Sequence, residues 1–232
     1  SLKSLELQKD PLLLFLPSDH SVENIKEFVE TINKSKSFAE KGNIVTYGIP
    51  PSEPETGYGY IEVEEKIIYQ KDDALEIKRF VEKPDKKKAQ DYYLSHKYYW
   101  NSGIFLLKAK VALRDIKKYS PNIFESCEAS IKRSIFDLDF QRIDKKSFFD
   151  CPNVSFDIAV MERTKVGKVF PLIVNWSDIG NWDSLWKISK KNIDGNVIKG
   201  KVVTRDVSNS YLLSEDRLIV GLGLSNIMII DT

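Results

Sequence analysis

The chain has 232 residues, of which 42% are hydrophobic and 30% charged, as in a folded globular protein rather than a disordered or fibrous one. Its 35 Lys and Arg residues balance 34 Asp and Glu residues, so the net charge of +1 gives no electrostatic reason to expect nucleic acid or a membrane surface as partner. No apolar run approaches the roughly 20 residues of a membrane span. Two cysteines, Cys127 and Cys151, are too few for a disulfide framework and lack CxxC spacing, so we expect reduced thiols in a cytoplasmic protein.

The first strong pattern is the apolar run Leu12–Leu16, which Pro17 ends and Asp19 follows. Five consecutive apolar residues predict a strand buried on both faces. Open α/β sheets bind ligands beyond the carboxyl ends of their strands, so Asp19 is a candidate site residue. The alternative is that Asp19 only caps the helix that follows.

An amphipathic helix is predicted next, because apolar residues recur at three- and four-residue steps from Val22 to Ile32, with Ser21 as a candidate N-cap. Ile44–Ile49 then predicts a second buried strand. Strand, helix and strand at this spacing indicate a βαβ unit with parallel strands.

Two loops carry residues that suit a ligand. The first contains two glycines that allow close approach of a ligand to the backbone, although a plain turn into an alternating strand explains them equally well. The second follows a predicted strand at 76–81 and places an acid beside a base, which could hold hydroxyls and a phosphate or could be surface charges. These residues are Glu55, Thr56, Gly57, Tyr58 and Gly59 in the first loop, and Glu82 and Lys83 in the second.

Further along, Asp85 is a candidate N-cap for a helix to Leu94, and helices are predicted at 109–119 and 121–134. Asn101 and Gly103 precede a buried strand at 104–107 and suit either a hexose or a tight turn.

The last part of this region places two more acids near predicted elements. Asp157 is expected to cap a short helix and is a candidate ligand contact. A strand at 166–174 leads to Asp178, so Asp19 and Asp178 both follow strands. Two carboxylates at strand ends of one sheet can share a crevice, which is how proteins commonly hold Mg²⁺.

Taken together and in order, these motifs resemble the mannose-1-phosphate guanylyltransferases, a branch of the sugar-1-phosphate nucleotidyltransferases. The resemblance covers positions 13 to 186 and continues into the tail. It rests on PSDH, PETGYGYIE, RFVEKPD, YYWNSGIFLL, SFDIAVMERT and WSDIGNW.

The resemblance implies an α/β fold with a Rossmann-like nucleotidyltransferase domain at 1–194, whose sheet is mixed and mostly parallel with flanking helices. It also implies Mg²⁺ as cofactor, bound by Asp19 and Asp178, with Lys83 on the sugar phosphate as the third catalytic residue. Glu82 would bind mannose hydroxyls, and Asn101 and Gly103 would line the hexose pocket beside Asp157. The loop Glu55, Thr56, Gly57, Tyr58 and Gly59 would contact the hexose and nucleotide.

The implied reaction joins GTP and mannose 1-phosphate into GDP-mannose, a precursor for polysaccharide biosynthesis, and releases pyrophosphate by a single in-line displacement. Such families open with a glycine-rich phosphate loop that does not occur before Leu12, so we expect roughly 60–100 residues to precede this sequence. An isomerase activity found in some relatives would require a further domain.

The segment 195–232 differs from the rest, with β-branched runs at 202–204, 210–212, 218–220 and 227–230 separated by turn residues. The pattern predicts strands separated by tight turns. The resemblance implies that they form a small β-helical tail, through which the protein would form a homodimer. Three functions stay open: this enzyme, a sister transferase for another base or sugar, and a non-catalytic regulatory subunit.

Overall fold

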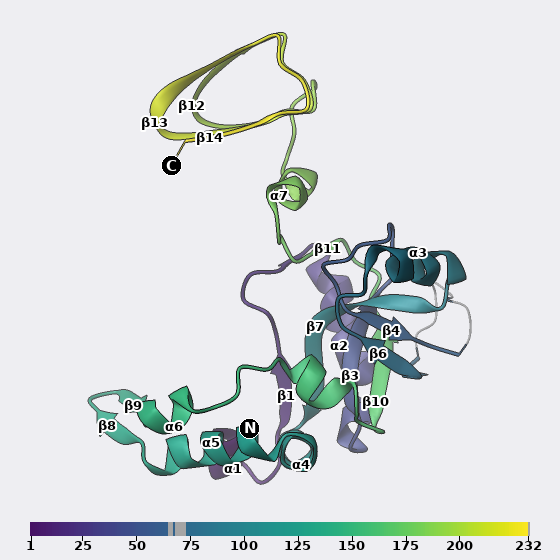
Figure 1. Ribbon diagram of the computed structural model, residues 1–232, viewed down its shortest axis with the longest axis vertical. Coiled ribbons are helices and arrows are strands. Elements are labelled where there is room, and N and C mark those ends of the chain that lie inside the picture. The colour runs from purple at the N-terminus through teal and green to yellow at the C-terminus, as the bar shows by residue number, and fades with distance from the viewer. Residues whose placement is uncertain (65–66, 68–72, 232) are drawn as a thin grey trace. The chain divides into compact units, whose positions relative to one another are not determined.

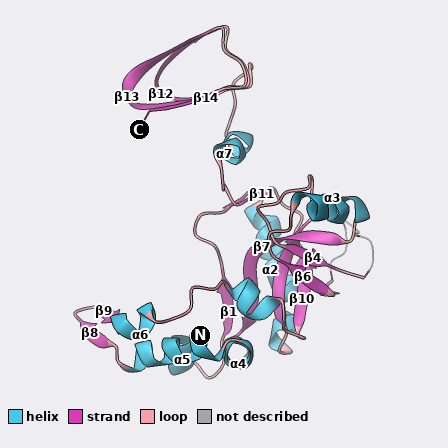
Figure 2. Ribbon diagram, viewed as in Figure 1, coloured by secondary structure: helices cyan, strands magenta, loops and turns pink. Residues whose placement is uncertain are grey.

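The computed structural model describes residues 1–64, 67 and 73–231 (Figures 1 and 2). The chain divides into two compact units: unit 1 contains Ser1–Ser18 and Val22–Asn175, and unit 2 contains Asp19–Ser21 and Trp176–Thr232. The domain boundary between residues 194 and 195 stays a prediction. Among the described residues, no helix is both long and apolar enough to cross a membrane.

Unit 1 is built on a seven-stranded mixed sheet in the order β5-β10-β3-β7-β4-β6, with β1 also paired to β7. The α/β fold is confirmed, but the expectation that most neighbouring strands run parallel is wrong. Among the described residues, the one parallel pair of neighbouring strands in this sheet is β3 with β10. The other neighbours are antiparallel: β7 with β1, β3 and β4, β10 with β5, and β4 with β6. The strands are β1 (Leu12–Phe15), β3 (Ile44–Ile49), β4 (Tyr60–Glu62), β5 (Leu75–Glu76), β6 (Arg79–Val81), β7 (Tyr98–Lys108) and β10 (Gly167–Pro171).

The first predicted strand differs from expectation. Leu14, Phe15 and Leu16 are 40%, 44% and 53% exposed rather than buried on both faces. Among the described residues, β1 pairs with β7 alone, so its other edge is open. It runs parallel to β3, as predicted, but β7 lies between the two strands, since Leu106 pairs with Leu14 on one side and Val45 on the other.

The helices of unit 1 largely follow the periodicity of the sequence, and those predicted from 86, 109 and 121 are confirmed. Asp85 caps its helix, because its carboxylate accepts the Lys88 N–H at 2.9 Å. Ser21 is not the cap of the second helix, since it lies in a strand and Asn24 precedes that helix. The helical elements are α1 (Leu2–Leu7), α2 (Ile25–Glu40), α3 (Lys86–Ser95), α4 (Ala109–Tyr119), α5 (Pro121–Lys132), α6 (Lys145–Phe149) and the π-helical turn η1 (Asp157–Met161).

Two further predictions for unit 1 need correction. The strand expected at 76–81 is two strands with different partners, because β5 pairs with β10 and β6 pairs with β4. Asp157 is the first residue of η1 rather than its cap, which is Phe156. A hairpin of β8 (Ile135–Asp137) and β9 (Phe140–Arg142) also interrupts the helical region.

The core of unit 1 lies between this sheet and α4 and η1. Its members are apolar side chains of β3, β4, β6, β7 and β10 packed against Val111, Ala112 and residues 159–161. At about 25 cal/mol per Å² of apolar surface, this burial is the main stabilising term for the unit. The core therefore holds β7 and η1, which carry site residues, on rigid supports.

Unit 2 contains β11 (Trp176–Ser177), the helix α7 (Trp182–Ile188) and a parallel sheet of β12 (Val197–Arg205), β13 (Tyr211–Leu222) and β14 (Met228–Asp231). The strand β2 (Ser21–Val22) pairs with β11 in a two-stranded sheet, and its first residue, Ser21, belongs to unit 2. Tyr211 pairs with both Val197 and Met228, so the chain returns to the same position on successive turns. The β-helical tail is thus confirmed. Two of its predicted strands are joined in β13.

Left-handed backbone positions repeat in the turns of this tail. Asp206 and Gly223 have φ of 53° and 62°, and Asn209 and Asn226 have φ of 47° and 54°. Asn and Gly are the residues that most readily adopt this conformation. Buried Asn196 ties two turns together, donating to Val207 O at 2.6 Å and accepting the Ser210 N–H at 3.0 Å.

Candidate functional site

The best-connected predicted site residues form a polar cluster in unit 1, which we call the Asn101–Asp157 cluster and define as Gly59, Glu82, Asn101 and Asp157. Asn101 Nδ2 donates to Asp157 Oδ1 at 2.9 Å, and the Asn101 N–H donates to Gly59 O at 2.8 Å. Asn101 comes from the middle of β7, Glu82 follows β6, and Asp157 begins η1. The fold therefore joins four residues that are spread over almost 100 positions of the chain.

The two carboxylates of this cluster are held in surroundings that disfavour their charge. Burial raises the pKa of Glu82, and the negative charge of Asp157 raises it further. Burial also raises the pKa of Asp157, against the opposing effect of hydrogen bonds from its backbone and from Asn101. Glu162, which the sequence analysis did not single out, raises both pKa values by its charge. The positive charge of Lys83 opposes this rise at Glu82 only in part. Such crowding of acids is typical of a site that binds a ligand.

Gly59 of the cluster and the nearby predicted site residue Gly103 are each required to be glycine for a different structural reason. A Cβ on Gly59 would lie 2.6 Å from Glu82 Oε2 and 3.3 Å from Asn101 Cβ, so only glycine leaves room for the carboxylate. Gly103 has φ of 69° and lies in a bulge of β7, where a left-handed residue is required.

The other predicted site residues of unit 1, in the loop Glu55–Gly59 and at Lys83, make mainly local contacts or are exposed. Glu55 Oε1 accepts the N–H groups of Thr56 and Gly57 at 2.8 and 3.0 Å, so its side chain shapes its own turn. Tyr58 packs edge-to-face on Trp100, with ring centroids 5.1 Å apart. Lys83 is exposed with φ of 44°.

A cavity of about 400 Å³ in unit 1 is lined by Gly103 and Asp157, and this volume lies in the range of small-molecule pockets. Its other walls are mainly apolar. They are formed by Ser1, Phe15, Leu16, Pro17, Phe105, Ala112, Ile116 and Phe156.

The two acids predicted to bind a metal lie in unit 2, next to the β2–β11 pair. Asp19 precedes β2 and its side chain is 81% exposed, whereas Asp178 follows β11 and is half-buried. They flank this small sheet rather than the ends of the large one, which corrects the expectation from sequence. Asp178 Oδ1 accepts the Gly180 N–H at 3.0 Å, across Ile179 with φ of 50°.

The direction of the β2–β11 pair brings the two acids to one end. Just beyond the strands, Glu23 N–H donates to Asn175 O at 2.9 Å, which sets the carboxyl end of β2 beside the amino end of β11. The pair is therefore antiparallel, and the other end has Asp19 and Asp178 as its flanking residues. His20 packs edge-to-face on Trp176 at 5.3 Å between centroids, as expected of a structural histidine.

These acids suit a metal that is shared with a ligand. Within residues 1–64, 67 and 73–231, no group of three or more His, Cys, Asp and Glu side chains is arranged to hold a metal ion. Two carboxylates are nevertheless enough for Mg²⁺, which keeps several waters and takes its remaining ligands from phosphates. The donor set of Asp19 and Asp178 therefore fits such an ion.

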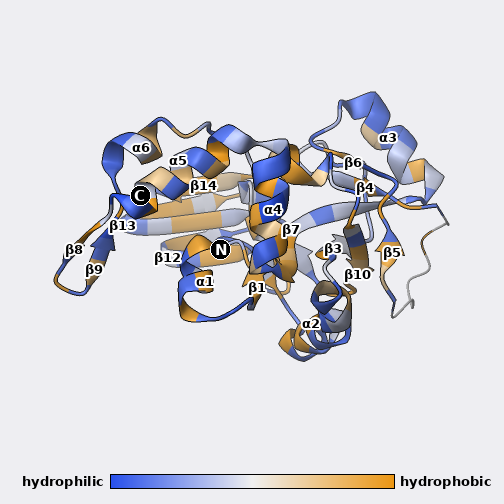
Figure 3. Ribbon diagram, turned by 90° about the horizontal axis from the view of Figure 1, so that it is seen from below, coloured by the Kyte–Doolittle hydropathy of each residue, from blue (hydrophilic) through white to orange (hydrophobic). Residues whose placement is uncertain are grey.

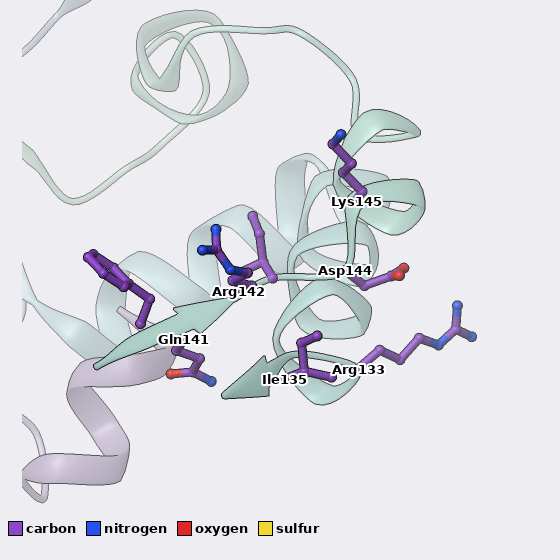
Figure 4. Close-up of a pocket in the computed structure, with 8 residues that line it drawn as sticks. Arg133, Ile135, Gln141, Arg142, Asp144 and Lys145 are labelled. Atoms are coloured by element: carbon purple, nitrogen blue, oxygen red, sulfur yellow. The ribbon is translucent and has the colours of Figure 1, made fainter. Parts of the chain in front are cut away.

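A larger cavity of about 710 Å³ lies at the β8–β9 hairpin (Figure 4). The residues that line it include none of the predicted site residues. Arg133 and Arg142 point away from each other there, and Arg142 already pairs with Asp137 at 2.5 Å. Apolar residues of the hairpin, such as Phe136 and Leu138, are exposed. Figure 3 shows hydrophobic, orange segments in the ribbon of the β8–β9 hairpin. The charged groups of this cavity do not converge on one point.

Comparison with known proteins decides the family. The model of the family described as Nucleotidyl transferase matches residues 2–195, which is most of the chain. The chain belongs to the nucleotidyl transferase family. This membership confirms the fold class that the motifs implied.

The relatives of this nucleotidyl transferase also confirm the resemblance stated from its motifs. It is 42% identical to a mannose-1-phosphate guanylyltransferase of Escherichia coli over 100% of this chain and 50% of the relative. A solved structure titled mannose-1-phosphate geranyltransferase, from Thermus thermophilus, has a TM-score of 0.78 at 27% identity and covers 95% of this chain and 63% of the other. One titled mannose-6-phosphate isomerase, from Helicobacter pylori, has a TM-score of 0.66 at 33% identity and covers 76% and 67%. The chain spans about half the length of the curated relatives it matches.

Two residues of this nucleotidyl transferase site were missed from the sequence. Glu162 is an ordinary exposed acid by its local pattern, and only folding brings its charge toward Glu82 and Asp157. Thr46 gives a signal that was available: it is a hydroxyl in the otherwise apolar run Ile44–Ile49, and it is fully buried.

We expect Glu82→Gln to stabilise the protein at neutral pH. A carboxylate with a raised pKa binds its proton more tightly in the folded state, so its contribution to stability falls as pH rises from the usual carboxylate range through the raised value. Removing the charge should therefore raise Tm at pH 7 by roughly 1–3 °C, and the gain should shrink toward pH 4.

Thermal melts at pH 7 and pH 4 measure this difference. Glu125→Gln, an exposed glutamate on α5, is the matched control and should leave Tm nearly unchanged at both pH values. A lower Tm for Glu82→Gln at pH 7 would show that the charged form is favourable in the fold.

Proposed function

We propose that the protein is a guanylyltransferase that converts GTP and mannose 1-phosphate into GDP-mannose and pyrophosphate. The observation that carries this proposal is the 42% identity, over the whole chain, to a relative with that name. The Asn101–Asp157 cluster and the pair Asp19 and Asp178 add chemical support, because a polyol and two phosphorylated reactants need hydroxyl acceptors and a way to offset negative charge.

The reaction is a single displacement at phosphorus. A phosphate oxygen of mannose 1-phosphate forms a bond to the α-phosphorus of GTP, and the bond from that phosphorus to the bridging oxygen of pyrophosphate breaks. The barrier is dominated by the approach of two anions. Lys83 would pair with the sugar phosphate as a point charge, while Glu82, Asp157 and Asn101 would orient the sugar through its hydroxyls.

Asp19 and Asp178 would hold Mg²⁺ in this proposal. When bound, the ion would supply charge neutralisation for the phosphates of both reactants. The carboxylates would fix its position, and the turn at Ile179 would fix the Asp178 side chain through its bond to Gly180. No side chain needs to form a covalent intermediate.

The proposal also covers features that the family match leaves open. We infer that the protein acts in the cytoplasm, with Cys127 and Cys151 as free thiols, and that it forms a homodimer through its β-helical tail. Support for the dimer comes from exposed apolar side chains of the tail, including Val203, Leu218 and Val220. An isomerase activity would require a domain beyond these residues and is not proposed.

Pyrophosphate release by the intact protein, measured with GTP, UTP and ATP against mannose 1-phosphate and glucose 1-phosphate, tests the function. We expect release with GTP and mannose 1-phosphate to exceed every other pair by at least about 100-fold in kcat/KM. Preference for another pair would identify a sister transferase. No release with any pair would identify a non-catalytic subunit.

We expect Gly59→Ala to weaken the use of mannose 1-phosphate. The added Cβ would lie 2.6 Å from Glu82 Oε2, so the carboxylate must move out of its place in the cluster. KM for mannose 1-phosphate should rise by about 10-fold, as for the loss of one good hydrogen bond, with a much smaller change for GTP.

Steady-state kinetics of Gly221→Ala, at a glycine of β13 that is not one of the predicted site residues, provide the matched control. The nearest atoms to a Cβ on Gly221 lie at 3.4 Å, an ordinary contact, so this change should have little effect. Equal rises of KM in the two variants would argue against a role for Glu82 in sugar binding.

A further inference from the structure

The Asn101–Asp157 cluster lies next to a bulge in the sheet, between β3 and β7. Thr46 of β3 pairs with Phe105 of β7, and Gly48 pairs with Asn101, so that residues 102–104 of β7 lie opposite Tyr47 alone. This bulge turns the strand locally, and Gly103 supplies the left-handed residue that it needs. Bulges leave backbone groups without their usual ladder partners, and buried ones must be satisfied otherwise.

Two buried hydroxyls, of Thr46 and Ser102, form hydrogen bonds with backbone groups of this bulge. Ser102 Oγ donates to Tyr47 O at 2.7 Å and accepts the Ile104 N–H at 3.3 Å. Thr46 Oγ1 lies 3.1 Å from Ile104 O and 3.0 Å from Asn101 Oδ1, and its single proton is shared between these two acceptors. Both hydroxyls support the bulge, but only that of Thr46 also reaches a side chain of the cluster.

The Asp157 carboxylate sets which way the Asn101 amide faces, because a hydroxyl such as that of Thr46 can either donate or accept. The Thr46 hydroxyl then holds the amide oxygen in place by donating to it. With Oδ1 directed to the hydroxyl, Nδ2 is directed to Asp157 Oδ1 at 2.9 Å. The opposite orientation would place the amide oxygen against the Asp157 carboxylate, where two acceptors repel. The hydroxyl of Thr46, a fully buried residue of β3, thus donates to the amide oxygen of Asn101, and the amide nitrogen donates to the Asp157 carboxylate.

We propose that Thr46 is a positioning residue for the sugar phosphate, acting through Asn101 to hold Asp157 in the place where it accepts from the hydroxyls of the sugar. This inference rests on the proposed function for the identity of the substrate. Thr46 does not itself touch the substrate. Its hydroxyl fixes Asn101 and, through it, Asp157, which would contact the sugar. A side chain that is already fixed loses less conformational entropy when the substrate binds.

Three variants of the intact protein separate positioning from packing. Thr46→Val removes the hydroxyl and nearly keeps the shape, Thr46→Ser keeps the hydroxyl, and Ser102→Ala removes the other hydroxyl of the same bulge without touching Asn101. We expect Thr46→Val to raise KM for mannose 1-phosphate by about 5- to 20-fold and KM for GTP by less than about 2-fold. Thr46→Ser should stay within about 3-fold of the unaltered protein.

The Ser102→Ala control decides the interpretation. It should lower Tm at least as much as Thr46→Val, since it loses two buried bonds to the bulge, to Tyr47 O and from the Ile104 N–H, where Thr46→Val loses the one to Ile104 O. It should nevertheless change KM for mannose 1-phosphate by less than about 3-fold. An equal rise of KM in Ser102→Ala and Thr46→Val would overturn the proposal and leave Thr46 with a packing role. An unchanged KM in Thr46→Val would also overturn it.

A readout without turnover keeps this test separate from the proposed function. The Asn101 side-chain amide, selectively labelled with ¹⁵N, should follow the titration of Asp157, which Glu82 and Glu162 also influence by their charges. Because the hydrogen bond from Asn101 favours the charged carboxylate, Thr46→Val should move the midpoint to higher pH, while Ser102→Ala should not. No pyrophosphate release from the unaltered protein would defeat the proposed function, whereas an unmoved midpoint in Thr46→Val would defeat the positioning role.

Discussion

Asp178→Asn is expected to lower turnover by roughly 10²- to 10⁴-fold while leaving the fold intact, because it removes one of two charged ligands from the proposed Mg²⁺ site. An asparagine retains an oxygen that can accept the Gly180 N–H, which Asp178 now accepts at 3.0 Å, so the turn should survive. Steady-state pyrophosphate release at saturating Mg²⁺, with circular dichroism for the fold, measures both parts.

A matched control comes from Asp216, an exposed acid of β13 in the same unit. Asp216→Asn makes the same change of charge and should keep turnover within about 2-fold, because an exposed charge far along the tail contributes little. If Asp178→Asn kept near-normal turnover, the metal role of Asp178 would be ruled out.

The second large effect concerns stability. Gly200→Ala should destabilise the β-helical tail by more than about 3 kcal/mol, since Gly200 has φ of 79° and a Cβ there would lie 1.7 Å from the backbone oxygen of Ser214. The left-handed conformation alone costs an alanine about 1–2 kcal/mol. The remainder arises because β12 and β13 must separate at a paired position, Gly200 with Ser214.

Hydrogen exchange of residues 197–231 measures this loss, and Gly223→Ala is its control. Gly223 also has a positive φ of 62°, but nothing lies within 4 Å of its Cβ position. Its substitution should cost only the conformational part, about 1–2 kcal/mol. Equal losses of stability in the two variants would show that Gly200 is not required for the close packing of successive turns.

The helices could be predicted because their signals are local. Asp85 and the periodic runs predicted as helices at 109–119 and 121–134 define caps and faces within one or two turns of chain. The structure has the Asp85 cap and helices at Ala109–Tyr119 and Pro121–Lys132. The β-branched runs of the tail were equally local, and their parallel stacking followed from the resemblance. Local patterns gave good predictions wherever the conformation of a segment did not depend on which distant segment it packs against.

Strand pairing could not be predicted in the same way. Leu12–Leu16 has the composition of a doubly buried strand, yet its exposure depends on which strands flank it, and β7 pairs with one side alone among the described residues. Whether residues 76–81 form one strand or two depends on β10 and β4, which are far away in sequence. These choices are made by long-range packing rather than by propensity.

The same limit applies to the candidate site. The sequence placed Glu82, Asn101 and Asp157 in three separate motifs, but their assembly and the crowding of their charges arise only from folding. Thr46 stands out in the sequence as a hydroxyl in an apolar run, but its link to Asn101 depends on the bulge in β7. The resemblance to guanylyltransferases supplied roles for the motif residues, and the contacts now indicate which of them depend on one another.

A double-substitution cycle on Asp19 and Asp178 is the most direct test of the proposal that the two carboxylates share one ion. Pyrophosphate release from GTP and mannose 1-phosphate would be measured for Asp19→Asn, Asp178→Asn and the double variant. If both acids act as one metal site, we predict that the double variant loses little more turnover than the worse single variant. Losses that multiply, or a single variant with normal turnover, would show that the two acids do not act on a common ion.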